Sequence, residues 1–115
     1  MKIYHNPRCQ KSREGLQLLE NSNQNFEVVD YLNNPLSEKQ LQEILKMLEM
    51  KPIELVRKNE SIWKENYKNK VLTDNDIIKA LCDNPKLIER PIVTKNDKAV
   101  LGRPPENIKV FLSLL

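Results

Sequence analysis

The stretch from Lys2 to Asn21 reads KIYHNPRCQKSREGLQLLEN and decides the fold. Lys2–His5 is typical of a short strand, and Gln10–Asn21 spaces its leucines as a helix with one buried face does. Cys9 therefore lies where a strand passes into the N-terminus of a helix. Phe26–Tyr31 follows as a second strand of β-forming residues. The segment predicts a right-handed β-α-β unit with parallel strands.

The middle of the chain predicts helices. A capping box opens one helix at Ser37 with Gln40, Pro52 suits the first turn of a short helix ending near residues 57–59, and Thr73 opens another. We expect a helical insertion over about residues 36–88.

The end of the chain predicts a hairpin and a helix. Residues 91–94 and 98–101 flank Lys95-Asn96-Asp97 as antiparallel strands, and a last helix, opened by Pro104-Pro105-Glu106, carries four apolar residues on one side: Ile108, Phe111, Leu112 and Leu115. The order β-α-β, helices, β-β-α predicts an α/β thioredoxin-like fold with a mixed sheet. We expect residues 1–115 to form a single domain.

Composition sets limits on the function. The chain has 115 residues, of which 39% are hydrophobic, and a net charge of +3. That length suits one compact core, and so small a basic surplus does not predict nucleic-acid binding. No stretch resembles a signal peptide or a membrane span, so we expect a cytoplasmic protein without membrane contact. We also expect a monomer. The two cysteines, Cys9 and Cys82, are too few for a structural zinc site.

The position of Cys9 predicts a reactive thiol. Unpaired backbone N–H groups at a helix start stabilise an anion, and nearby positive charge lowers the pKa of a cysteine. Arg8 and Arg13 flank Cys9, and His5 lies at the end of the strand. Ser12 stands where a dithiol oxidoreductase carries its second cysteine; its hydroxyl can donate a hydrogen bond to the thiolate but cannot resolve a disulfide. Any redox cycle therefore needs an external thiol.

Three arginines at the ends of predicted elements complete the candidate site. Arg57 follows a short helix, Arg90 precedes the hairpin, and Arg103 follows it. Because a hairpin brings its ends side by side, we expect Arg90 and Arg103 to be neighbours. Guanidinium groups match the oxygens of tetrahedral oxyanions.

With these residues in place, the sequence resembles the glutaredoxin-coupled arsenate reductases, in the arsenate reductase and Spx-like branch of the thioredoxin superfamily. The resemblance rests on four blocks in order, YHNPRCQKSR at 4–13, LVRKN at 55–59, ERPIV at 89–93 and LGRP at 101–104. It implies an oxidoreductase that reduces arsenate to arsenite, with glutathione as co-substrate, glutaredoxin as partner and no bound cofactor or metal.

The resemblance also implies residue roles. Cys9 attacks arsenate, while Arg57, Arg90 and Arg103 hold the oxyanion. His5 and Ser12 support the thiolate, and Pro91 is a candidate cis-proline facing Cys9. Cys82 matches no catalytic position, and its helix, with Ile77, Ile78 and Leu81, favours core packing.

Two other functions remain open. One is a glutathione-dependent thiol reductase with another substrate, although such relatives tend to lack the arginine found here at Arg103. The other is a Spx-like redox-sensing transcriptional regulator that binds RNA polymerase. Such regulators commonly switch through a Cys-x-x-Cys pair, which Ser12 breaks.

Overall fold

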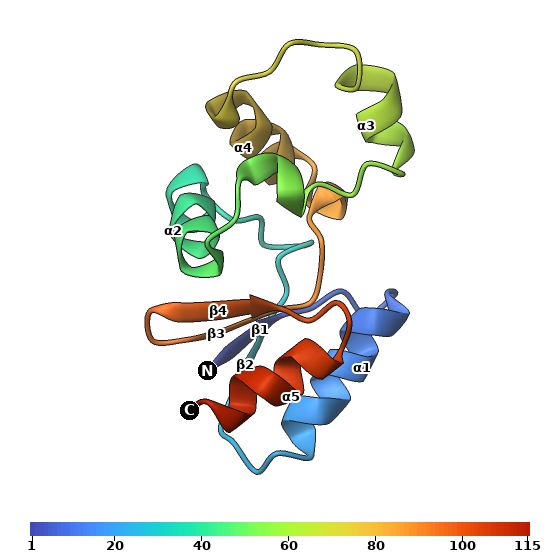
Figure 1. The fold of residues 1–115 in the computed structure, drawn as a ribbon. Coiled ribbons are helices and arrows are strands. Elements are labelled where there is room, and N and C mark those ends of the chain that lie inside the picture. Colours follow the sequence, from blue (N-terminus) through green and yellow to red (C-terminus); the bar gives the residue numbers. More distant parts are fainter. The chain divides into compact units, whose positions relative to one another are not determined.

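The computed structural model describes all 115 residues and divides them into two compact units (Figure 1). The first unit joins Met1–Asn33 to Arg90–Leu115, and the second is Asn34–Glu89. The second unit contains only helices and one isolated bridge, at the place where the sequence predicts a helical insertion over about 36–88. That the whole chain forms a single domain stays a prediction.

The first unit contains the sheet. Its elements are β1 (Lys2–Tyr4), α1 (Gln10–Glu20), β2 (Glu27–Val29), β3 (Ile92–Lys95), β4 (Lys98–Leu101) and α5 (Glu106–Ser113). The strand order is β2-β1-β3-β4, with β1 parallel to β2 and the other two pairs antiparallel. The predicted order β-α-β followed by β-β-α, and the mixed sheet, are confirmed.

The core of this unit lies between the sheet and the two helices, which Figure 1 shows on the same face. Ile3 of β1 pairs with Val93 of β3, and both are fully buried. Leu19 of α1 and Ile108 and Phe111 of α5 pack against them. The apolar face that residue spacing predicted for each helix therefore packs against the sheet.

Two glycines let these helices approach the start of the hairpin. A Cβ atom on Gly15 of α1 would lie 2.7 Å from Pro91 Cγ, and one on Gly102 would lie 2.6 Å from Ile108 Cδ1. Both distances are too short for real carbon contacts. The absence of a side chain at Gly15 thus allows α1 to pack directly on Pro91, one residue after Arg90.

The second unit contains α2 (Glu38–Leu48), η1 (Pro52–Leu55), α3 (Ser61–Asn66), α4 (Asp74–Asp83) and η2 (Pro85–Leu87). Capping boxes of Ser37 with Gln40 and Thr73 with Asp76 open α2 and α4. α4 contacts α2, η1 and η2, and buried apolar residues fill the space between them: Leu41, Ile44, Leu55, Ile77, Leu81 and Leu87.

Several boundaries differ from the sequence expectations. The second strand stops at Val29 because the Asp30 carboxylate accepts hydrogen bonds from Asn33 and turns the chain. The helix after Pro52 ends at Leu55 because Val56 forms an antiparallel bridge with Ile88.

Three further details also differ. Lys95 belongs to β3, which leaves Asn96-Asp97 as the hairpin loop. Leu115 lies beyond α5 and is 46% exposed, so its predicted place on one side of the last helix with Ile108 and Phe111 is wrong. Helix α3 is not predicted by the sequence, because its N-cap residue Glu60 makes no side-chain cap and the helix buries only Trp63. None of the helices combines the length and apolar character needed to cross a lipid bilayer.

Candidate active site

Cys9 is the N-cap residue of α1, with an extended backbone of φ −96° and ψ 123°. Its carbonyl oxygen accepts the first helical hydrogen bond, from the backbone N–H of Arg13 at 3.0 Å. Its own N–H donates to the carbonyl oxygen of Asn6 at 3.0 Å. The chain therefore turns tightly from β1 into α1, and the thiol stands at the helix N-terminus as the sequence predicted.

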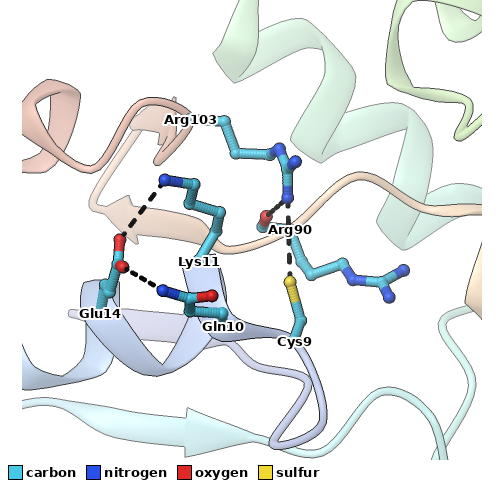
Figure 2. A network of polar contacts seen from close by, with 6 residues as sticks. All are labelled: Cys9, Gln10, Lys11, Glu14, Arg90 and Arg103. Atoms are coloured by element: carbon cyan, nitrogen blue, oxygen red, sulfur yellow. Dashed lines mark hydrogen bonds and ion pairs between the residues drawn. The ribbon is translucent and has the colours of Figure 1, made fainter.

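Both arginines of the hairpin belong to the surroundings of Cys9 (Figure 2). Arg103 Nη1 lies 3.8 Å from Cys9 Sγ and also donates to the carbonyl oxygen of Arg90 at 3.4 Å. The backbone N–H of Gly102 donates to the carbonyl oxygen of Pro91 at 2.8 Å, which joins the two ends of the hairpin. The expected proximity of Arg90 and Arg103 is confirmed. The Arg90–Pro91 and Arg103–Pro104 peptide bonds are both cis.

The pKa of Cys9 lies below the ordinary value of a thiol, although partial burial opposes ionisation. The backbone N–H of Ser12, the guanidinium group of Arg90 and the backbone N–H of Lys11 together outweigh that burial. The sequence pointed to Arg8 and Arg13 as the nearby cations. In the structure the cations beside the sulfur are Arg90 and Arg103, while Arg13 Nη1 donates to the Pro7 carbonyl oxygen at 2.9 Å.

Ser12 is fully buried, and its hydroxyl oxygen lies 2.7 Å from His5 Nδ1. The same oxygen accepts the backbone N–H of Asn6 at 2.9 Å. Ser12 thus reaches the thiolate through its backbone N–H, whereas its hydroxyl fastens the end of β1 to α1. The predicted hydrogen bond from the hydroxyl to the sulfur is replaced by this contact with His5. Burial, more than any charge, holds the pKa of His5 below its ordinary value.

Asn6 is a residue that sequence reasoning missed. It is 4% exposed, and its Oδ1 atom accepts the backbone N–H of Arg8 at 2.9 Å. With its carbonyl oxygen bonded to the N–H of Cys9, Asn6 closes the turn that carries the thiol. Its place directly before Pro7 is typical of turns and was the only available signal.

The remaining candidates lie in the second unit. Arg57 follows η1; its N–H donates to the carbonyl oxygen of Leu87 at 2.7 Å, and its Nε lies 3.9 Å from Glu60 Oε1. Its role in an oxyanion site stays a prediction. Cys82 is half-buried on α4, where burial, Glu38 and Asp83 raise its pKa. Such a thiol is a poor nucleophile at neutral pH. No cluster of histidine, cysteine and carboxylate side chains in the chain suits a metal ion.

The chain resembles known proteins over most of its length. The model of the ArsC family matches residues 4–111. The chain is 49% identical over 110 residues to Escherichia coli YfgD, covering 94% of this chain and 92% of that protein. It is 42% identical over 114 residues to an arsenate reductase of Neisseria meningitidis, covering 97% of each.

The fold agrees as well. The solved structure of an arsenate reductase from Vibrio cholerae superimposes with a TM-score of 0.89 at 40% identity, covering 96% of this chain and 97% of that one. This likeness confirms the predicted thioredoxin-like α/β fold. By sequence and by fold, the chain belongs to the ArsC family.

Proposed function

We propose that this protein reduces arsenate to arsenite through the thiolate of Cys9. The observation that carries the proposal is the setting of one sulfur atom: Cys9 Sγ stands at a helix start, 3.8 Å from Arg103 Nη1, with a pKa that Arg90 helps to lower. A thiolate beside guanidinium groups suits attack on a tetrahedral oxyanion. Relatives named arsenate reductase, at 42% identity, favour arsenate as that oxyanion.

The first step is nucleophilic. The sulfur of Cys9 forms a bond to arsenic, and one arsenate oxygen takes up protons and leaves as water. Arg90 and Arg103 hold the remaining oxygens and balance their negative charge, and we assign Arg57 as the third arginine. His5 and Ser12 support this step by holding the turn that carries the thiolate.

The electrons come from outside the protein, because Ser12 stands where a resolving cysteine would be. Glutathione bonds to the arsenic through its sulfur and displaces a second oxygen as water. A glutaredoxin thiol then attacks the glutathione sulfur, and the electron pair of the S–As bond stays on arsenic, which passes from As(V) to As(III). Water releases arsenite from Cys9, and a glutaredoxin–glutathione disulfide is the oxidised product.

This scheme needs no bound cofactor and suits a monomer in the cytoplasm, where glutathione is kept reduced. A coupled assay tests it by following NADPH consumption with glutathione, glutathione reductase and glutaredoxin, with and without arsenate. We expect arsenate-dependent turnover in the wild type, none in Cys9→Ser, and near wild-type turnover in Cys82→Ser. A wild type that consumes NADPH no faster with arsenate than without it would exclude arsenate as the substrate.

A further inference from the structure

A cleft of about 500 Å³ lies between α1 and α5 in the first unit. Its volume falls within the roughly 300–1,000 Å³ of small-molecule sites. The α1 wall carries Lys11 and Glu14, and the α5 wall carries Glu106 and Lys109. Each wall thus presents one lysine and one glutamate, three residues apart and on one face of its helix. Apolar surface is supplied by Leu18 and Pro105.

Both walls begin beside Cys9. The backbone N–H of Lys11 is one of the groups that lower the pKa of the Cys9 thiol. On the other wall, Pro104 also lines the cleft and directly follows Arg103, whose Nη1 is 3.8 Å from Cys9 Sγ. Figure 2 shows the Lys11 side chain between Glu14 and Arg103. A molecule lying in the cleft would therefore have one end close to the nucleophile.

We propose that this cleft binds the glutathione that reacts with the arsenic on Cys9. The assignment rests on the proposed function. Glutathione carries two carboxylates and one ammonium group, so its charges can pair with the two lysines and with Glu14, while Glu106 stays exposed to solvent. Its peptide backbone would lie on Leu18 and Pro105, between those charges.

The cleft has charges available for such a ligand. Lys11 Nζ and Glu14 Oε2 lie 3.7 Å apart, with side chains 46% and 39% exposed. An ion pair this open to solvent contributes little to stability, so it can exchange for contacts with a ligand at small cost. The glutathione thiol would then bond to the arsenic and displace an oxygen as water, which is the second step of the proposed cycle.

S-Methylglutathione tests the site without chemistry, because its sulfur is blocked. In amide NMR spectra of the wild-type chain, we expect its titration at millimolar concentrations to shift the signals of Lys11, Leu18, Glu106 and Lys109. The Lys98 amide, on β4 and outside the cleft, should not move. Cys9→Ser should bind equally well, because the proposed contacts do not involve the sulfur of Cys9.

Charge variants sharpen the test. Lys11→Gln and Lys109→Gln should each raise the Kd for S-methylglutathione about two- to fivefold, as expected for solvent-facing ion pairs. Lys98→Gln is the matched control and should leave the Kd unchanged. In turnover assays, Lys109→Gln should lower the rate at limiting glutathione, recover at high glutathione, and keep the wild-type KM for arsenate.

The outcomes separate this site from the proposed function. Absence of shifts in the cleft, with arsenate turnover intact, overturns the site alone. Shifts in the cleft without any arsenate turnover overturn the proposed function and leave the cleft as a glutathione site. If the cleft signals respond to glutaredoxin and not to S-methylglutathione, the surface docks a protein and our assignment is wrong.

Discussion

Arg103 Nη1 lies 3.8 Å from Cys9 Sγ, although the two residues are 94 positions apart in the chain. The same atom donates to the carbonyl oxygen of Arg90, so both ends of the β3–β4 hairpin meet the start of α1. The guanidinium group of Arg90 is among the groups that lower the pKa of Cys9. We therefore expect the two arginines to share both roles, favouring the thiolate and then holding the oxyanion.

The first prediction concerns the pH dependence of iodoacetamide labelling. In the wild type, the rate at Cys9 should reach half its maximum below pH 9.0, the ordinary pKa of the thiol, and Cys82 should label only at higher pH because its pKa is raised. Arg90→Met should move the Cys9 midpoint upward and slow labelling at pH 7, because the thiolate loses one of the two guanidinium groups beside it. Mass spectrometry of the labelled peptides measures both rates.

Arg8→Met is the matched control for Arg90→Met. Arg8 is exposed and adjacent to Cys9 in sequence, yet the groups that lower the pKa of Cys9 do not include it. We expect its labelling profile to overlay that of the wild type. If Arg8→Met raised the midpoint as much as Arg90→Met did, the charge would be supplied by the local sequence and not by the hairpin.

These arginines show what sequence could and could not predict. Local sequence patterns predicted that Cys9 lies between a strand and a helix, and that Arg90 and Arg103 lie at neighbouring ends of a hairpin. They did not predict which cations lie beside the sulfur, because this depends on how the hairpin packs against α1 through Gly15 and Pro91. From the sequence alone, cations close to Cys9 in the chain, such as Arg8, were therefore predicted to lower its pKa.

Ser12→Ala tests whether the hydroxyl acts on the fold or on the sulfur. Its removal leaves two buried partners unsatisfied, the N–H of Asn6 and Nδ1 of His5. We expect a loss of about 1–3 kcal/mol in the free energy of unfolding, measured by urea denaturation. The labelling midpoint of Cys9 should change little, since the part of Ser12 that lowers the pKa of Cys9 is its backbone N–H, which alanine keeps. A large rise in that midpoint with unchanged stability would assign the hydroxyl directly to the thiolate.

We expect substitutions of Asn6 to lower stability and turnover by graded amounts. Asn6→Ala removes the acceptor for the N–H of Arg8 and should loosen the turn before Cys9, lowering stability by about 1 kcal/mol and turnover several-fold. Asn6→Ser should be intermediate, because a serine hydroxyl accepts the same type of bond more weakly. Arsenate kinetics and urea denaturation check the order. Equal activity in all three proteins would show that this turn does not position the thiol.

We expect the protein to lose stability in mild acid because of His5. Burial, aided by the charge of Arg13, lowers its pKa below 6.5, and this outweighs the opposite effects of Ser12 and Asp30. Below pH 6.5 the unfolded chain therefore takes up a proton that the folded protein resists, so stability falls as pH drops from 6.5 toward the folded value. His5→Gln, which can still bond Ser12, should show a shallower decline between pH 7 and pH 5. Parallel unfolding curves for the two proteins would contradict this.

Sequence reasoning was weakest where a side chain decides an element boundary. Asp30 ends β2 by accepting hydrogen bonds from Asn33, although Phe26–Tyr31 contains the β-forming residues of a longer strand. α3 was missed because Trp63 is its only buried residue, which leaves no periodic pattern to detect. Helix starts marked by a capping box could be predicted from the sequence, because a capping box is a local signal. Ser37 with Gln40 predicted the start of α2 correctly.

Gly15→Ala sets helix propensity against packing. Alanine at this position of α1 should gain about 1 kcal/mol of helix propensity. Its Cβ atom would lie 2.7 Å from Pro91 Cγ and 2.8 Å from Ile108 Cδ1, and overpacking of this kind costs about 1–3 kcal/mol. We therefore expect the free energy of unfolding, measured by urea denaturation, to fall by up to about 2 kcal/mol. Gln17→Ala, on the exposed face of α1, should change it by less than about 0.5 kcal/mol.

The same substitution at Gly15 should affect the thiol. Because Pro91 follows Arg90, displacing the proline should also move the Arg90 guanidinium and raise the labelling midpoint of Cys9. A Gly15→Ala protein that is more stable than the wild type and labels identically would mean that α1 shifts freely, and that its contact with Pro91 does not hold the site together.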